Sequence, residues 1–306
     1  MDTQIRKSTK RHPWFAALLS LLMPGLGQLY CGAIIRCLWL LALTSAAGML
    51  GVVALIPGVR LTGGLVVACY ALSVLVYAIG ILDAFFTARR TRVDYAPKDY
   101  NRWQAYLLLG VAVSAGHVFS ALYVRDNWLM PFKVPAASMY PAIWQGDQLF
   151  ATMNAYREKD PAVGDIVVFQ NPEDRRVDYI KRVVALAGDR VEIRDGVVYV
   201  NDVKLRREEI PAPATVPARM GGGGGYFYEF NRDARYRVLL TAAANSQLRN
   251  FPSTTVPRHH CFVLGDNRDN SLDSRSYGAI PIASIIGQAS FIYAPDENWA
   301  RFGSLR

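Results

Sequence analysis

Cysteine and histidine are scarce in this sequence, with four of each among 306 residues. Three of the cysteines lie in apolar, membrane-like sequence, so Cys261 alone remains in the polar half and cannot form an internal disulfide there. CxxC pairs and Cys/His clusters with the spacing of a zinc site are absent. The composition therefore gives no reason to expect a metal site.

Acidic residues are scarce in the first 124 residues, which hold 4 Asp and Glu beside 11 Lys and Arg. Residues 125–306 hold 21 Asp and Glu beside 23 Lys and Arg. The positive charge, +9 in total, therefore lies beside apolar segments, where the positive-inside rule places the cytoplasmic flanks of membrane proteins. A basic groove for phosphates is not indicated, so nucleic acid is not an expected partner.

Apolar runs of membrane length fill the N-terminal third of the chain. Residues 37–57, 62–86 and 105–124 are each long enough to cross a bilayer, which takes ~20 residues. An earlier apolar run breaks at "MPGLGQLYCG", where Pro and Gly impose irregular backbone that a bilayer does not tolerate unless protein buries it. We interpret residues 14–31 as a re-entrant or interfacial helix-turn, retained because no clean small-residue cleavage site follows.

Basic flanks at 6–11 and 87–104 both carry a cytoplasmic signal. Both flanks lie on the cytoplasmic side if the chain crosses the membrane an even number of times between them. This holds if 37–57 and 62–86 cross and 14–31 does not. The sequence thus predicts a polytopic membrane module at 1–104 with a cytoplasmic loop at 87–104. The span at 105–124 is then an anchor that places everything after it outside the cytoplasm.

From residue 130 onward, short β-branched runs alternate with turn signals, and no long helix is evident. The fold class predicted is a helical transmembrane region followed by a mostly-β extracytoplasmic domain over 125–306. Prolines and the run Gly221–Gly225 interrupt the pattern at about 206–235, which we interpret as a flexible surface insertion. The expected strands are 165–170, 177–186, 190–194, 197–201, 236–240, 261–265 and 285–293.

The expected strand "YIKRVV" (179–184) contains two adjacent cations. Alternation points Lys181 and Arg182 to opposite faces, both otherwise apolar, so at least one cation lies against hydrophobic neighbours. Arginine cannot lose its proton in a protein, whereas burial lowers the pKa of a lysine toward neutrality. A neutral lysine is a general base, so Lys181 is a candidate for that role.

Four segments together resemble the bacterial type I signal peptidases, which are membrane-anchored serine proteases with a Ser/Lys dyad. "SMYPAI..GD" (138–147) is similar to the nucleophile motif, and "GDIVVF" (164–169) and "YIKRVVALAGD" (179–189) to the motifs around the lysine. "GDNRDNSLDSRSYGAIP" (265–281) matches the last motif almost residue for residue. The resemblance covers roughly 105–306 and leaves the first ~100 residues as an added module, for which anchoring and partner recruitment are both open.

The resemblance implies a role for each residue of the site. Ser138 would be the nucleophile, Lys181 the general base and Ser271 the hydroxyl that hydrogen-bonds and orients the lysine. Asp273 and Arg275 would form a supporting ion pair beside the site. The reaction would use no metal and no cofactor. The substrate pockets would be lined by Val134, Pro135, Met139, Ile143, Tyr179 and Ile180.

One position departs from the family pattern. Many members carry a serine two residues before the nucleophile, whose hydroxyl helps to bind the oxyanion, but here that residue is Ala136. The backbone N–H of Ser138 remains as a donor. Loss of one oxyanion donor costs ~10²–10³ in rate, so another donor or a slower enzyme are the two alternatives.

The function implied is removal of signal peptides from exported preproteins after Ala-X-Ala-like sites, at the bacterial cytoplasmic membrane. The expected partners are those signal peptides and the lipid bilayer, with the secretion machinery as a further candidate. Two alternatives stay open: a peptidase dedicated to one exported client, and a non-catalytic scaffold that binds exported peptides. A Ser-His-Asp arrangement through His260 is the alternative chemistry.

Overall fold

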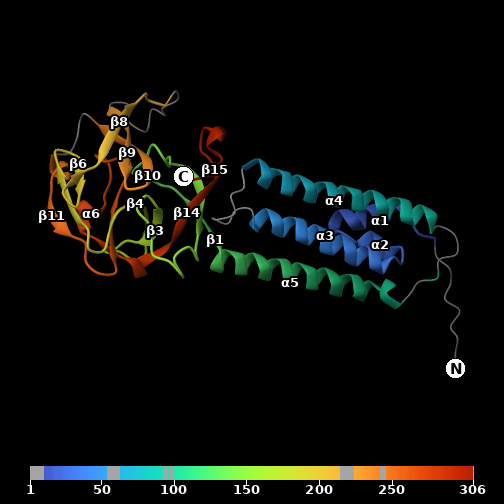
Figure 1. Cartoon of the computed structure of the whole chain (residues 1–306). Coiled ribbons are helices and arrows are strands. Elements are labelled where there is room, and N and C mark those ends of the chain that lie inside the picture. Colours follow the sequence, from blue (N-terminus) through green and yellow to red (C-terminus); the bar gives the residue numbers. More distant parts are fainter. Residues whose placement is uncertain are drawn as a thin grey trace. The chain divides into compact units, whose positions relative to one another are not determined.

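The computed structural model describes residues 10–53, 63–91, 96, 99–213, 224–241 and 246–305. The chain divides into two compact units, residues 1–123 and 124–306. The first is helical and the second is built mainly of strands (Figure 1). The helices of the first unit are α1 (Pro13–Leu22), α2 (Leu26–Tyr30), α3 (Ile34–Val53), α4 (Gly63–Arg90), the 3-10 turn η1 (Asp99–Asn101) and α5 (Trp103–Asn127), which runs on into the second unit.

The predicted helix-turn at 14–31 has the form of two helices joined by a tight turn. Gly25 adopts φ +90° at the start of α2, a conformation that glycine reaches without strain. A Cβ added to Gly27 would lie 2.2 Å from Ala16 O, so α1 and α2 pack too closely there for any other residue. The fully buried Gln28 donates to Gly80 O at 2.7 Å, which ties the turn to α4. Re-entrance into a bilayer stays a prediction.

Two helices in the described ranges are long and apolar enough to cross a membrane: Val67–Arg90 and Trp103–Asn127. The apolar part of α3, Ile34–Leu50, is shorter than that test requires. Helix α4 continues four residues past the predicted end at 86, into the expected loop. Parts of the predicted spans, at 54–57 and 62, lie outside the described residues. The topology and the sidedness of the module remain predictions.

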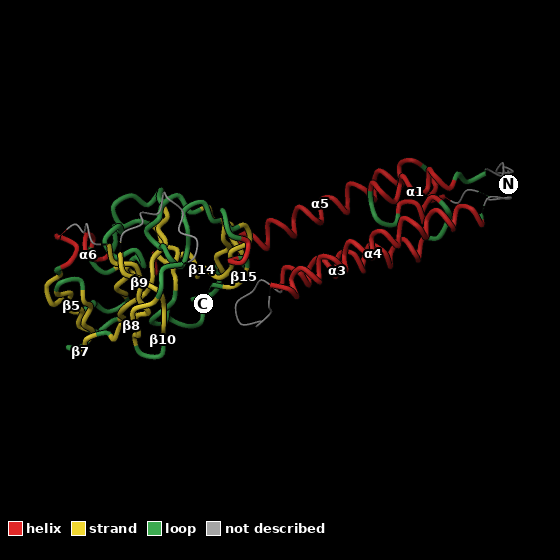
Figure 2. Tube along the Cα trace, turned by 90° about the horizontal axis from the view of Figure 1, so that it is seen from above, coloured by secondary structure: helices red, strands yellow, loops and turns green. Residues whose placement is uncertain are grey.

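The second unit contains three antiparallel sheets. The main sheet has the order β1-β2-β14-β3-β4-β12-β13, and β15 also pairs with β14, outside this order. The smaller sheets have the orders β10-β9-β8 and β11-β5-β6-β7. Figure 2 shows how strands and connecting loops alternate through this unit. The strands are β1 (Leu129–Lys133), β2 (Gln148–Thr152), β3 (Ile166–Gln170), β4 (Asp178–Leu186), β5 (Arg190–Arg194), β6 (Val197–Val200), β7 (Val203–Lys204), β8 (Arg206–Ile210), β9 (Gly224–Asn231), β10 (Ala234–Thr241), β11 (Phe251–Thr255), β12 (His260–Leu264), β13 (Ile280–Pro281), β14 (Ile285–Ala294) and β15 (Gly303–Ser304).

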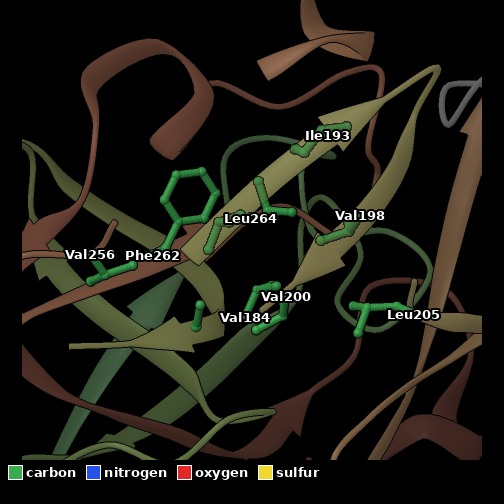
Figure 3. Packing of buried hydrophobic residues seen from close by; sticks show 10 residues of the cluster. Val184, Ile193, Val198, Val200, Leu205, Val256, Phe262 and Leu264 are labelled. Atoms are coloured by element: carbon green, nitrogen blue, oxygen red, sulfur yellow. The ribbon is translucent and has the colours of Figure 1, made fainter. Parts of the chain in front are cut away.

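The hydrophobic core continues on more than one face of the main sheet. One cluster joins β4 and β12 to the β5–β6 hairpin, with Val184 and Leu264 facing Ile193 and Val198 (Figure 3). The expected turn at Asp195-Gly196 closes this hairpin, with both residues at positive φ. A second cluster packs the loop after β1 against β2, β3 and β14. Strand β4 is therefore held between β3 and β12, which fixes the residues it carries.

The interpretation of 206–235 as an irregular insertion is corrected by the structure. Strands β8, β9 and the start of β10 occupy half of it, and they form one of the two smaller sheets; residues 214–223 lie outside the described residues. Four of the five residues of β8 are charged, a pattern that hides a strand from sequence inspection. The last two glycines of the glycine run, Gly224 and Gly225, begin β9; the other three lie outside the described residues.

Candidate active site

Ser138 lies in the loop that connects β1 to β2. Both ends of this loop are closed by backbone bonds, from Val134 N to Asp147 O at 2.9 Å and from Gly146 N to Val134 O at 2.8 Å. Asp147 is fully buried and forms an ion pair with Arg301 near the C-terminus. The loop is therefore anchored on both sides, which holds Ser138 on a rigid support.

Lys181 projects from the middle of β4 toward this loop. Its Nζ lies 2.8 Å from Ser138 Oγ and donates a second hydrogen bond to Ile180 O at 2.9 Å. The lysine is 4% exposed, and burial lowers its pKa from 10.5 to about 8, although the charges of Asp273 and Asp266 act in the opposite direction. The structure thus brings the two candidate catalytic residues together, 43 positions apart in sequence.

Arg182 turns away from Lys181, as strand alternation predicts, but it does not reach solvent. It is 3% exposed and forms a two-pronged ion pair with Asp266, at 2.7 Å and 2.6 Å. Its Nη1 also donates to Gly164 O, and its guanidinium stacks over the Tyr236 ring at 4.6 Å. A buried carboxylate therefore compensates this cation, whereas Lys181 has no direct ion-pair partner in the described chain.

Asp273 and Arg275 form an ion pair with contacts of 2.8 Å at both carboxylate oxygens, and both side chains are buried. Asp273 also accepts the N–H of Gly265 and caps the short helix α6 (Ser274–Tyr277). Arg275 additionally donates to Arg268 O. The pair thus fastens the beginning of the last motif, at Gly265 and Arg268, to its middle.

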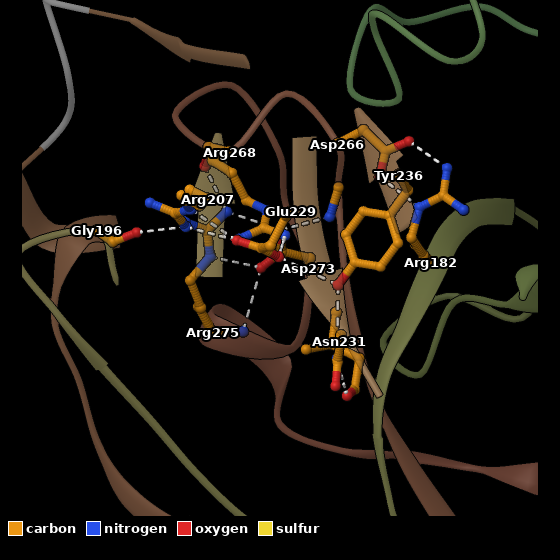
Figure 4. A network of polar contacts seen from close by, with 12 residues as sticks. Arg182, Gly196, Arg207, Glu229, Asn231, Tyr236, Asp266, Arg268, Asp273 and Arg275 are labelled. Atoms are coloured by element: carbon orange, nitrogen blue, oxygen red, sulfur yellow. Dashed lines mark hydrogen bonds and ion pairs between the residues drawn. The ribbon is translucent and has the colours of Figure 1, made fainter. Parts of the chain in front are cut away.

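Further buried charges extend this network into the small sheet of β8, β9 and β10 (Figure 4). Glu229 of β9 is fully buried between Arg207 of β8 and Arg268 of the last motif, and it accepts the hydroxyl of Tyr236. The region that the sequence had suggested was an insertion is therefore joined by ion pairs to the motif beneath the site.

Ser271 differs from the expectation. It is 5% exposed and lines the same cleft as Ser138 and Lys181, yet its Oγ has no hydrogen-bond partner among the described residues. The expected bond to Lys181 is not formed; the hydrogen bonds of Lys181 Nζ go to Ser138 Oγ and Ile180 O. A Cβ on Gly265 would lie 2.1 Å from Ser271 Oγ, so this serine packs directly on the glycine that opens the motif.

A cleft of about 330 Å³ opens beside Ser138. Five of the six residues expected to bind substrate line it; Ile143 does not, and is instead a fully buried member of the core beneath the loop. Sequence reasoning missed several lining residues, which come from β1, from the start of β4 and the residue before it, and from the last motif. They are Phe132, Lys133, Val177, Asp178, Asn270 and Leu272.

His260 takes no part in this arrangement. It is the first residue of β12, its ring Nδ1 contacts Arg258 O at 2.8 Å, and it is not among the residues that line the cleft. Among the described residues, the titratable side chain that contacts Ser138 Oγ is that of Lys181.

Comparison with known proteins now decides the family. The family described as "Signal peptidase, peptidase S26" matches residues 104–294. The chain belongs to this family. Its relatives include a probable signal peptidase I-1 of Synechocystis sp., 34% identical over 60% of this chain and 81% of the relative. Signal peptidase I of Rickettsia typhi is 32% identical over 56% of this chain and 75% of the relative.

Among solved structures, a signal peptidase I from Enterococcus faecalis V583 is 27% identical, covers 43% of this chain and 98% of its own, and has a TM-score of 0.27. Membership of the signal peptidase family makes this protein a serine protease. The family match begins at residue 104, so the helices α1–α4 lie before it.

Proposed function

We propose that this signal peptidase removes N-terminal signal peptides from exported proteins through a Ser138/Lys181 dyad. The observation that carries the proposal is the 2.8 Å contact between Lys181 Nζ and Ser138 Oγ, made by a lysine that burial keeps largely from solvent. A serine hydroxyl is a weak nucleophile until a neighbouring base accepts its proton, and a lysine with a lowered pKa is such a base.

The dyad supports a two-stage reaction. Neutral Lys181 accepts the Ser138 proton as Oγ bonds to the scissile carbonyl carbon, and the lysine then gives this proton to the departing amine as the peptide bond breaks. A water next loses a proton to Lys181 and attacks the acyl-enzyme. The mature chain leaves in the first stage; the second frees the signal peptide, and Ser138 regains its proton. The Ser138 N–H is the donor for the oxyanion in both stages.

The cleft also supports a preference for small side chains, of the Ala-X-Ala kind. Val134 and Met139, which line it, are almost fully buried, and Tyr179 and Ile180 of β4 line it as well. Apolar walls around about 330 Å³ accept an extended peptide but leave little depth for large side chains. Backbone groups along β4 would hold the peptide as an added strand.

The substrate is expected to arrive while its signal peptide is still in lipid. Helices Val67–Arg90 and Trp103–Asn127 would anchor the enzyme in the cytoplasmic membrane as a multi-pass protein. The catalytic unit would lie outside the cytoplasm, because the basic flanks favour the other side. This placement also makes the secretion machinery a candidate partner.

The test is cleavage of an exported preprotein by the full-length protein in detergent or vesicles. Wild type should cut after an Ala-X-Ala site, whereas Ser138→Ala and Lys181→Met should not. Matched controls are Ser253→Ala and Lys204→Met, which change the same residue types at exposed positions. Cleavage that survives both dyad changes would overturn the proposed mechanism, and binding without cleavage by the wild type would favour a scaffold. A comparison of exported N-termini in cells with and without the protein separates a general enzyme from one with a single client.

A further inference from the structure

Asn267 of the last motif grips the nucleophile loop on both sides of Ser138. Its side-chain Nδ2 donates to Ala137 O at 3.2 Å, and its backbone N–H donates to Ser138 O at 3.0 Å. Asn267 is 1% exposed, and its Oδ1 has no hydrogen-bond partner among the described residues. The carboxamide therefore makes a single hydrogen bond in this part of the chain, and that bond goes to the residue before the nucleophile.

This grip fixes the direction of the donor that faces the substrate. A trans peptide unit is planar, with its C=O and N–H on opposite sides. The carbonyl of Ala137 accepts both Asn267 Nδ2, at 3.2 Å, and the backbone N–H of Tyr140, at 3.1 Å. Because it points toward Asn267, the N–H of Ser138 in the same unit points away from Asn267. Within the described residues that N–H makes no hydrogen bond, so it is available to a ligand in the cleft that Ser138 lines.

The backbone of Asn267 is itself held from another direction. Leu239 of β10 bridges to Asn267, with hydrogen bonds from Leu239 N to Asp266 O and from Arg268 N to Leu239 O. Leu239 is fully buried and packs in the cluster that contains Tyr140, two residues after the nucleophile. The small sheet thus holds the backbone of Asn267 in place. Its carboxamide makes its one hydrogen bond to the peptide unit that precedes Ser138.

We propose that Asn267 is a positioning residue for the oxyanion, which acts by aiming the Ser138 N–H into the cleft. This rests on the proposed function, and it identifies what compensates for Ala136. No hydroxyl is available at position 136, so the backbone N–H is the principal donor and its orientation sets the rate. Loss of an oxyanion donor lowers kcat by ~10²–10³, and a misdirected donor should cost a large part of that.

Kinetics of Asn267 variants on a preprotein test this assignment. Asn267→Ala removes the bond to Ala137 O but keeps the backbone bond to Ser138 O, so kcat should fall by about tenfold or more with little change in KM. Asn267→Asp places an acceptor against the Ala137 carbonyl and should lower kcat further. In Asn267→Ala the pH midpoint that reports Lys181 should stay where it is, because this change alters no charge and does not touch the lysine.

Two further variants separate positioning from general loss of structure. Asn231→Ala is the matched control: Asn231 is equally buried, and its Nδ2 also donates to a backbone carbonyl, that of Val184, at 2.8 Å. It should destabilise the fold similarly yet keep kcat. Ala136→Ser supplies the missing hydroxyl, and in that background the effect of Asn267→Ala should be smaller.

Each outcome decides the assignment. Unchanged kcat in Asn267→Ala, an equal loss in Asn231→Ala, or an effect of the same size in the Ala136→Ser background would overturn it. A wild-type protein that cuts no preprotein contradicts the proposed function instead, and this result is distinct from a wild type that cuts while its Asn267 variants cut equally well.

Discussion

The acidity of Lys181 predicts the pH dependence of cleavage. An amine accepts the serine proton only when it is neutral, and the buried lysine has its pKa lowered to about 8. At pH 7 roughly one lysine in ten is then neutral, against roughly one in 3,000 for an ordinary lysine. Burial therefore raises the reactive fraction about 300-fold at neutral pH, equivalent to about 3 kcal/mol.

The expected profile follows from the sign of this shift. Below about pH 8 the ammonium dominates, so kcat/KM should rise tenfold per pH unit and then level above about pH 8. The measurement is kcat/KM for a preprotein at a series of pH values, because this ratio reports groups of the free enzyme. The profile must be repeated with a short peptide substrate, which excludes titration of the preprotein as the cause.

A midpoint near that of a free lysine would refute the reasoning, because it would mean that the amine is hydrated in the working enzyme. A profile without an acidic limb between about pH 6 and pH 8 would refute it equally, since the base would then be another group.

Two other predictions concern stability and specificity. Lys181→Met should raise the free energy of unfolding at neutral pH by up to about 3 kcal/mol, because burying the ammonium destabilises the wild-type fold by that amount. This gain should shrink as pH rises above about 8, because Lys181 then loses its proton in the folded protein before it does so in the unfolded chain. Denaturant unfolding followed by tryptophan fluorescence measures it, and a variant less stable than wild type at pH 7 would contradict it. Ile143→Val should cost about 0.5–1.5 kcal/mol of stability without changing which residues are accepted before the cleavage site, whereas Val134→Ala should widen that choice. Cleavage of a set of preproteins varied at those positions measures both, and equal shifts in specificity would contradict the assignment of Ile143 to the core.

Much of the β domain could be predicted because its central strands are apolar and bounded by turns. The expected strands at 165–170, 177–186 and 190–194 agree with β3, β4 and β5 to within a residue. Strands β1 and β8 could not be found in this way: β1 contains a proline, and β8 reads Arg-Arg-Glu-Glu-Ile. Such segments become strands because a partner pairs with them, and a partner distant in sequence leaves no local signal.

The site shows the same division between local and distant information. The resemblance of the motifs made Ser138 and Lys181 candidates. The sequence does not predict that Lys181 Nζ lies 2.8 Å from Ser138 Oγ. The roles of Asn267 and of the cleft residue Leu272 depend on where the last motif crosses the nucleophile loop, more than 120 positions away. The fate of Arg182 was likewise open, since strand alternation gives its direction but not its buried partner.

The buried arginines around the site suggest why Lys181 can lose its proton in an acidic neighbourhood. Asp273 and Asp266 both raise the pKa of Lys181, and either carboxylate on its own would favour the ammonium. Each is already paired, Asp273 with Arg275 and Asp266 with Arg182. Arginine keeps its charge at all relevant pH values, so these pairs neutralise the carboxylates permanently and leave the lysine as the group that titrates.

Arg275→Gln tests this argument. Without the guanidinium, which lowers the pKa of Lys181, the charge of Asp273 acts uncompensated, so the acidic limb of kcat/KM should move to higher pH. Activity should fall at neutral pH and recover in alkaline buffer, which a folding defect would not do. Arg207→Gln is the matched control, because it also removes an arginine from a buried carboxylate, Glu229, that does not act on Lys181. An unmoved limb in Arg275→Gln would show that desolvation alone sets the acidity of the lysine. Equal displacement in both variants would show that the effect does not depend on the Asp273–Arg275 pair, and it would contradict the argument as well.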